Sequence, residues 1–274
     1  MFSFQKLIEN KKRPLVMGIL NITPDSFSDG GESFSLSGAL ERLHCLEKEG
    51  ADIIDIGACS TAPMNEPVSC DEEIKRLSFL PELVKNASVP LSIDTFRPEV
   101  AEFALKNGVS IVNDESGCFS QAMAEVVKKY NAGWIFMHTG GKSSKDVKEY
   151  PNGVLNDVLN YFEGCYKKAT DFGVNKDSLF FDFGIGFGKS REDDLLLLCE
   201  CEKIAAYYPL LVGVSRKRII GEIVNEKDAK NRVAGSVAAA ALVAYKGAEI
   251  LRVHDVKETV DAMNIVSAVV KGYI

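Results

Sequence analysis

The cysteines of this 274-residue sequence lack the even number and regular spacing of a disulfide framework or a zinc site. The sequence holds seven cysteines, an odd number, and no two of them are spaced as Cys-x-x-Cys. A disulfide framework and a structural zinc site are therefore not expected. The thiols are expected to stay reduced, which predicts a cytoplasmic protein.

Long hydrophobic runs are also absent. The most apolar stretch, Val233–Tyr245, contains Gly235 and Ser236 and is shorter than the ~20 residues that span a bilayer. The first residues, Met-Phe-Ser-Phe-Gln-Lys, soon turn polar and lack the apolar core of a secretory signal. Neither a membrane partner nor a secretory leader is expected.

Positive charge is in the minority, since 32 Lys and Arg stand against 39 Asp and Glu, a formal net charge of −7. This balance argues against a nucleic-acid partner and against an anionic membrane surface. Hydrophobic residues make up 46% and charged residues 26%, as in ordinary globular proteins. No linker or low-complexity tract divides the chain, so one domain is expected over residues 1–274.

Short apolar, β-branched runs alternate with helical patterns along the chain. Eight such runs are expected to be strands: Leu15–Leu20, Ile53–Ile56, Leu91–Asp94, Ser110–Asn113, Trp134–His138, Leu179–Phe183, Leu210–Val214 and Ile250–Val253. Nearly continuous apolar strands indicate a parallel sheet covered by helices. Eight strand–helix units predict a single (β/α)8 TIM barrel, and a doubly wound sheet is the alternative.

Polar side chains stand where nearly every expected strand ends. They are Asn21, Asp94, Asn113, His138, Asp182, Lys217 and His254, with Arg252 just inside the last strand. One such residue is usually a turn former or a helix cap. Because the carboxyl ends of barrel strands meet at one face, the whole set predicts a convergent site.

These groups fall into two chemical sets. Asp94, Asn113 and Asp182 suit a flat heterocycle, since a carboxylate can accept two parallel N–H bonds from the edge of an aminopyrimidinone. The other set suits a phosphate or a carboxylate and consists of Lys217, Arg252 and His254. Arg252 and His254 are two positions apart, so both leave one face of a strand.

The glycine-rich segment Gly184–Ser190 resembles a phosphate loop only at first sight. Three residues separate Gly184 from Gly188, whereas the nucleotide-binding pattern requires four. These glycines are expected instead to let the backbone approach a planar ligand.

One long motif, MGILNITPDSFSDGG, occupies Met17–Gly31. Six further segments are Ser92–Val100, Ile111–Gly117, Asp182–Lys189, Leu211–Lys217, Ala234–Ala240 and Arg252–Val260. Together these segments resemble the dihydropteroate synthase family. The resemblance runs almost from end to end. It implies a transferase of folate biosynthesis, which condenses 6-hydroxymethyl-7,8-dihydropterin pyrophosphate with p-aminobenzoate to give 7,8-dihydropteroate and pyrophosphate.

The resemblance also implies roles for individual residues. It places Asp94, Asn113, Asp182 and Lys217 at the pterin edge, with Met137 and Gly213 lining the slot. It places Arg252 against the pterin, and Arg252 with His254 on the pyrophosphate. It implies Mg2+ on that pyrophosphate, held in part by Asn21. The p-aminobenzoate side would be shaped by Phe27, Thr61, Pro63, Phe187 and Ser215.

Two loops depart from the family pattern. Where the family usually reads G-E-S-T-R-P, this chain has Ala58–Pro63, and Ala62 stands in place of an arginine that contacts pyrophosphate. Where the family usually has M-H-M-x-G, this chain has Met137-His-Thr-Gly-Gly. His138 keeps its place there and is interpreted as structural. We expect these changes to leave the pterin side intact and to bear on the second substrate, the binding of pyrophosphate and the binding of sulfonamides.

Two other functions compete with the synthase. A pterin-dependent methyltransferase shares a similar barrel, but it would not need Asn21 with the long TPDSFSDGG loop or the basic phosphate clamps. A pterin-binding paralogue with weak or no synthase activity is suggested by Ala62. A homodimer through the last helices is expected from the Ala-rich helix after the seventh strand and from the family pattern.

Overall fold

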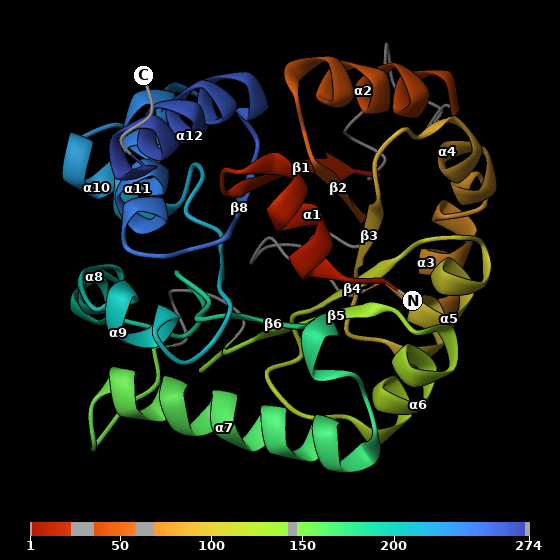
Figure 1. Cartoon of the computed structure of the whole chain (residues 1–274), viewed down its shortest axis with the longest axis horizontal. Coiled ribbons are helices and arrows are strands. Elements are labelled where there is room, and N and C mark those ends of the chain that lie inside the picture. Colours follow the sequence, from red (N-terminus) through yellow and green to blue (C-terminus); the bar gives the residue numbers. More distant parts are fainter. Residues whose placement is uncertain (1, 23–35, 59–67, 142–146, 272–274) are drawn as a thin grey trace.

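A closed ring of parallel strands forms the centre of the protein (Figure 1). The structure is a computed structural model that describes residues 2–22, 36–58, 68–141 and 147–271. Within these ranges one sheet has the strands β1 (Leu15–Asn21), β2 (Ile53–Gly57), β3 (Leu91–Asp94), β4 (Ile111–Asp114), β5 (Gly133–Met137), β6 (Leu179–Asp182), β7 (Leu211–Val212) and β8 (Ile250–Val253).

The strand order is β6-β5-β4-β3-β2-β1-β8-β7, and every pairing is parallel. A parallel bridge between Phe181 and Leu210 brings β6 beside β7, which closes the sheet. This closure confirms the predicted (β/α)8 barrel and excludes the doubly wound sheet, which has two open edges. The predicted strands are confirmed to within about two residues at each end, as expected for boundaries.

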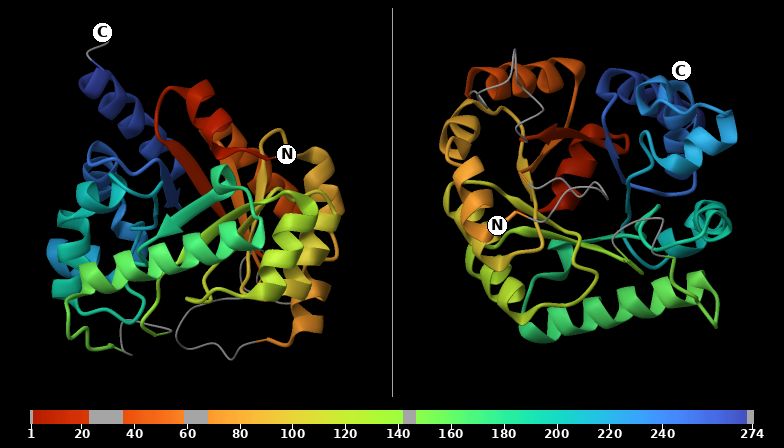
Figure 2. Two further views of the ribbon diagram at one scale, coloured as in Figure 1. Left: turned by 60° about the horizontal axis from the view of Figure 1, so that its bottom comes forward. Right: turned by 180° about the vertical axis from the view of Figure 1, so that it is seen from behind.

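Helices surround the strands on the outside (Figure 2). They are α2 (Leu36–Glu49), α3 (Cys70–Arg76), α4 (Leu80–Asn86), α5 (Pro98–Lys106), α6 (Gln121–Tyr130), α7 (Val154–Phe172), α8 (Arg191–Cys199), α9 (Cys201–Ala205), α10 (Arg218–Val224), α11 (Val233–Tyr245) and α12 (Val256–Lys271), with 3-10 turns at Lys176–Ser178 and Ala229–Asn231. Local chemistry sets several boundaries. Pro81 and Pro98 lie in first turns, where the missing N–H is tolerated, and Ser190 with Asp193 forms a capping box at the start of α8.

A short helix that sequence patterns did not predict, α1 (Phe4–Lys11), crosses the amino-terminal end of the barrel (Figure 1). The ring of Phe4 packs 4.5 Å from that of Phe180, centroid to centroid, and Phe4 is fully buried. It joins an inner apolar cluster with strand residues such as Met17 and Ile111. This apolar plug fills one end of the barrel, so the polar residues of its interior lie toward the carboxyl ends of the strands.

The strand register places the predicted polar residues side by side. Asn21 of β1 pairs with Gly57 of β2, Gly57 with Asp94 of β3, and Asp94 with Asn113 of β4. These residues therefore form one row across four strands at the carboxyl end. The convergence expected from strand ends that are far apart in sequence follows directly from this pairing.

Candidate active site

Arg252 of β8 lies at the centre of the polar cluster. Its Nε donates to Asp55 at 2.6 Å and its Nη2 to Asp94 at 2.6 Å. Asn113 Nδ2 donates to the same oxygen of Asp55 at 3.1 Å. Burial raises the pKa of Asp94 well above its usual range, the charge of Glu115 acts in the same direction, and Arg252 opposes both. The guanidinium is thus held in a fixed orientation by two carboxylates.

Lys217 lies across the site, at the residue before α10. Its Nζ is 4.3 Å from the ring centroid of Phe187, a distance that allows a cation–π contact. Burial lowers the pKa of Lys217, while the carboxyls of Glu115 and Asp182 oppose the fall. Asp182 Oδ1 accepts the N–H of Gly184 at 2.7 Å, which fixes the orientation of that carboxyl.

Gly213 and Met137 border the same space. A Cβ atom at position 213 would lie 3.9 Å from both Asp182 Oδ2 and Arg252 Cβ, so the glycine leaves room between them. Met137 pairs with Asp182 in the register of β5 and β6. A Cβ atom at Gly184 would come within 3.2 Å of Met137 Cγ. Met137 therefore lies at the base of the glycine loop, the segment Gly184–Gly188 that follows β6.

His254 follows β8 and contacts Ser215. Its backbone N–H donates to Ser215 Oγ at 3.2 Å, and the same oxygen lies 3.1 Å from Nδ1 of the ring. Burial lowers the pKa of His254 to about 4, and the positive charges of Arg216 and Arg252 act in the same direction. The imidazole is therefore neutral at pH 7. Arg216 itself donates to Asp255 at 3.1 and 2.5 Å.

Asn21 ends β1 at the exposed rim of the row. A Cβ atom on its neighbour Gly57 would lie 3.3 Å from Asn21 Oδ1 and 3.7 Å from Asp94 Oδ2. A side chain at position 57 would therefore crowd the gap between the amide and the carboxyl, which explains why glycine suits this position.

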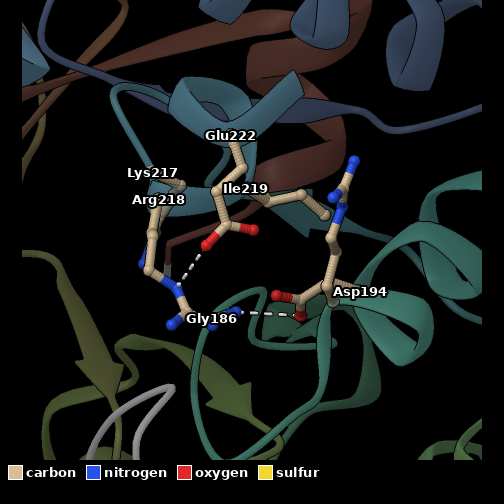
Figure 3. Close-up of a pocket in the computed structure, with 7 residues that line it drawn as sticks. Gly186, Asp194, Lys217, Arg218, Ile219 and Glu222 are labelled. Atoms are coloured by element: carbon tan, nitrogen blue, oxygen red, sulfur yellow. Dashed lines mark hydrogen bonds and ion pairs between the residues drawn. The ribbon is translucent and has the colours of Figure 1, made fainter. Parts of the chain in front are cut away.

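A buried lysine organises the glycine loop after β6. Lys189 Nζ donates to the carbonyl oxygens of His138, Gly184 and Phe187 at 3.2, 2.8 and 3.1 Å. Gly184 has a φ of +63°, a conformation that favours glycine. On the other side of the loop, Asp194 Oδ1 accepts the N–H of Gly186 at 2.9 Å (Figure 3). Figure 3 shows Lys217 on the opposite wall of this small pocket.

His138 is a buried residue that packs behind the site. Its Nε2 lies 3.0 Å from Asp157 Oδ2. Burial lowers the pKa of His138 to about 4, and the charge of Lys189 adds to this effect. These contacts agree with the structural interpretation of this residue.

Several predicted residues lie outside the described ranges. They are Phe27, Thr61, Ala62 and Pro63. Their assignments to the p-aminobenzoate side and to the pyrophosphate clamp remain predictions.

Sequence patterns assigned no role to three residues of the cluster. Asp55 lies in the middle of an apolar strand and is fully buried in the structure. The signal available in the sequence was an acidic residue inside an apolar run. Glu115 and Lys189 lie inside segments that carry the family resemblance. Their roles depend on contacts across the barrel, which spacing alone does not indicate.

The fold and these side chains define a (β/α)8-barrel enzyme site that suits a planar, N–H-bearing ring beside an anionic group. Residues 17–254 match the family model of pterin binding enzymes. The dihydropteroate synthase of Synechocystis sp. is 39% identical over 269 residues, which cover 96% of this chain and 93% of that protein.

Solved structures of similar proteins agree with this family match. The dihydropteroate synthase of Xanthomonas albilineans with 4-aminobenzoic acid has a TM-score of 0.88 and 40% identity, covering 94% of this chain and 93% of that one. The Clostridium difficile enzyme in the presence of pteroic acid has a TM-score of 0.88 and 38% identity, covering 94% and 97%. The chain belongs to the dihydropteroate synthase family of pterin-binding enzymes. The relatives do not favour the methyltransferase alternative.

Proposed function

We propose that this chain condenses 6-hydroxymethyl-7,8-dihydropterin pyrophosphate with p-aminobenzoate to form 7,8-dihydropteroate and pyrophosphate in folate biosynthesis. The observation that carries this proposal is the convergence of Asp94, Asn113, Asp182, Lys217 and Arg252 at one end of the barrel. The solved relatives bound to 4-aminobenzoic acid and pteroic acid support it.

The pterin is proposed to bind through its polar edge. The carboxyls of Asp94 and Asp182 provide acceptors for ring and amino N–H groups, and Asn113 provides an amide. Lys217 adds a donor to a ring oxygen or nitrogen, while Met137 and Gly213 bound the slot. Buried polar groups of this kind reject rings that leave them unpaired, which gives the site its specificity.

The pyrophosphate is proposed to leave toward Arg252 and His254. The bond from the exocyclic carbon to the pyrophosphate oxygen breaks, and its electron pair departs with the leaving group. The amine nitrogen of p-aminobenzoate then forms the new C–N bond, and its excess proton passes to the solvent. In this scheme fixed charges around the developing ions stabilise the transition state, and no side chain acts as a nucleophile.

Mg2+ is proposed as the cofactor. The amide oxygen of Asn21 borders the gap beside Gly57 and Asp94, and an oxygen ligand on the rim fits the chemistry of this ion. Mg2+ commonly takes one or two protein oxygens and completes its shell with phosphates and waters. When bound, it would neutralise negative charge on the leaving pyrophosphate.

The p-aminobenzoate is proposed to lie beside Phe187 and Ser215. Phe187 offers an apolar ring held against Lys217, and the Ser215 hydroxyl is a polar neighbour of His254. Phe27, Thr61 and Pro63 are proposed to complete this side.

A coupled assay tests the activity. Dihydropteroate and pyrophosphate are measured together, with and without Mg2+, for the wild-type chain and for Arg252→Met. Equal, Mg2+-dependent formation of both products by the wild type, with a large loss in the variant, supports the proposal. Absence of product together with retained pterin binding by calorimetry would support the non-catalytic paralogue that Ala62 suggests.

The chain is proposed to form a homodimer through α11 and α12, which pack against each other on one flank (Figure 1). Large apolar side chains are exposed on these two helices: Leu242, Tyr245, Ile265, Val269 and Val270. Clusters of this kind commonly mark protein interfaces.

Analytical ultracentrifugation of the wild type should show a dimer, and Leu242→Glu should weaken it. Tyr166→Glu, at an exposed aromatic of α7 on another side of the barrel, is the matched control (Figure 1).

A cytoplasmic location is proposed from the thiols. Six cysteines lie in the described part of the chain, and none forms a disulfide. No described helix has the length and apolar character needed to cross a bilayer.

A further inference from the structure

Glu115 is the first residue after β4 and follows the alternation of that strand. Ile111 belongs to the cluster inside the barrel, and Asn113 also points inward, where it donates to Asp55 at 3.1 Å. Asp114 points outward and accepts from Trp134 Nε1 at 3.2 Å. Since side chains alternate between the two faces of a strand, Glu115 follows Asn113 on the inner side, nearer the mouth of the barrel.

The charges around Glu115 agree with that position. Burial raises the pKa of Glu115, and the positive charges of Arg252 and Lys217 oppose the rise more than any other groups. Glu115 is in turn the charged group that most raises the pKa of Asp94. The carboxyl therefore faces the residues assigned to the pterin.

One oxygen of this carboxyl is unpaired. Glu115 Oε2 is buried and has no hydrogen-bond partner among the residues that the structure describes. The two cations are oriented toward other groups, because Arg252 donates to Asp55 and Asp94 and Lys217 lies over an aromatic ring. Buried polar atoms in proteins are nearly always hydrogen-bonded, so an unpaired acceptor inside a binding site points to a donor on the ligand.

The balance of charge favours a neutral N–H donor over a further anion at this point. Two cations, Arg252 and Lys217, stand among four buried or partly buried carboxyls: Asp55, Asp94, Glu115 and Asp182. An anionic group against Glu115 would add to this excess, whereas an N–H group would satisfy the unpaired oxygen without added repulsion.

We propose that Glu115 is a further substrate-binding residue, whose Oε2 accepts a hydrogen bond from an N–H group of the bound dihydropterin. The side chain thereby selects ring systems that present a donor at the mouth of the site. This inference rests on the proposed function, because it takes the pterin to lie between Arg252 and Lys217.

Two substitutions separate this role from a structural one. Glu115→Leu removes the acceptor, and Glu115→Gln keeps an acceptor oxygen without the charge. Calorimetry measures the affinity for 6-hydroxymethyl-7,8-dihydropterin pyrophosphate without p-aminobenzoate, and thermal unfolding is followed in parallel. Glu125→Leu, at an exposed glutamate of α6, is the matched control.

Glu115→Leu is expected to weaken binding by about 10-fold or more, the effect of losing one charged hydrogen bond. Glu115→Gln should bind with intermediate affinity. The melting temperature of both should equal or exceed that of the wild type, since an unpaired buried carboxyl is removed. Glu125→Leu should bind like the wild type.

Affinity of Glu115→Leu within about twofold of the wild type would overturn the proposal. So would weaker binding that accompanies a lower melting temperature in both variants, because that result indicates a structural role. Failure of the proposed function has a different signature: the wild type then makes no dihydropteroate, while the comparison of affinities still decides the role of Glu115.

Discussion

Arg252 Nε lies 2.6 Å from Asp55 Oδ2, although β1 separates the strands that carry the two residues. The same oxygen accepts from Asn113, so one carboxylate joins β2, β4 and β8 inside the barrel. Asp55 is completely buried, and its contacts fix the orientation of a cation and an amide that the proposed pterin site uses. Positioning by such neighbours maintains the geometry that electrostatic catalysis requires.

Replacing Asp55 by Asn is expected to impair catalysis. The neutral amide cannot balance Arg252, and loss of one charged hydrogen bond corresponds to about 1.5–3 kcal/mol, or roughly 10- to 150-fold in kcat/KM. Steady-state kinetics on folded protein test this. Asp52→Asn is the control, because Asp52 is also buried but pairs with Arg13. Equal kinetic losses in both variants would contradict a specific role for Asp55.

Replacing Lys189 by Met is expected to loosen the glycine loop. Three carbonyl oxygens lose their donor, and one unsatisfied buried group typically costs about 1–3 kcal/mol of stability. Chemical denaturation should show the loss, and calorimetry should show weaker pterin binding because Gly184, whose N–H orients the carboxyl of Asp182, is no longer held by Lys189. Lys128→Met, which removes an exposed bond to Phe172, should change neither. Wild-type stability and affinity in Lys189→Met would refute this role.

Replacing Arg97 by Met is expected to destabilise the fold. Arg97 pairs with Glu73, whose side chain is 1% exposed, and donates to the carbonyl of Val68 at 2.7 Å. Removing one partner of a buried ion pair costs about 3–5 kcal/mol, because the other charge stays buried. Urea unfolding measures the loss, and adding Glu73→Leu to the variant should restore part of it. No recovery in the double variant would assign the loss to Val68 instead.

The rings of His138 and His254 are expected to stay neutral down to about pH 5, because burial lowers both pKa values to about 4. Between pH 6.5 and 4 the unfolded chain then binds protons first, so these two residues reduce stability as the pH falls. Asp194, whose pKa burial raises to about 6, acts in the opposite direction over the same interval. NMR titration of the histidine nitrogens tests the first point, and a midpoint above pH 6 for His254 would disprove it.

Introducing arginine at position 62 is expected to raise activity if the family contact to pyrophosphate is absent from this chain. A charge-assisted hydrogen bond contributes about 1.5–3 kcal/mol, so kcat/KM should rise roughly 10-fold or more in Ala62→Arg. Ala62→Met provides a similar length without the charge. A rise in both variants would indicate an effect of size, and no rise in Ala62→Arg would indicate that another group serves as the clamp.

Much of the site was predictable because its residues end strands. A polar residue after an apolar run marks the carboxyl end of a strand, which is how Asp94, Asn113 and Asp182 were identified. Glu115 could have been found in the same way, since it lies two positions beyond Asn113 and follows the same alternation. The buried amino-terminal helix was missed, because a short amphipathic segment is stabilised mainly by packing, and the partner of Phe4 lies on β6.

The amino-acid sequence by itself determined the alternation of eight strands and their helices, and hence the barrel, because hydrophobic periodicity and helix-end signals act over a few residues. It also determined which polar groups reach the carboxyl ends of the strands. Only the tertiary structure decided the partners of the buried polar groups. Asp55 pairs with Arg252, Lys189 donates to three carbonyl oxygens, and one carboxyl oxygen of Glu115 is left without a partner among the described residues. The physical reason is that these contacts form between strands and loops far apart in the chain, and closure of the barrel sets their distances and burial.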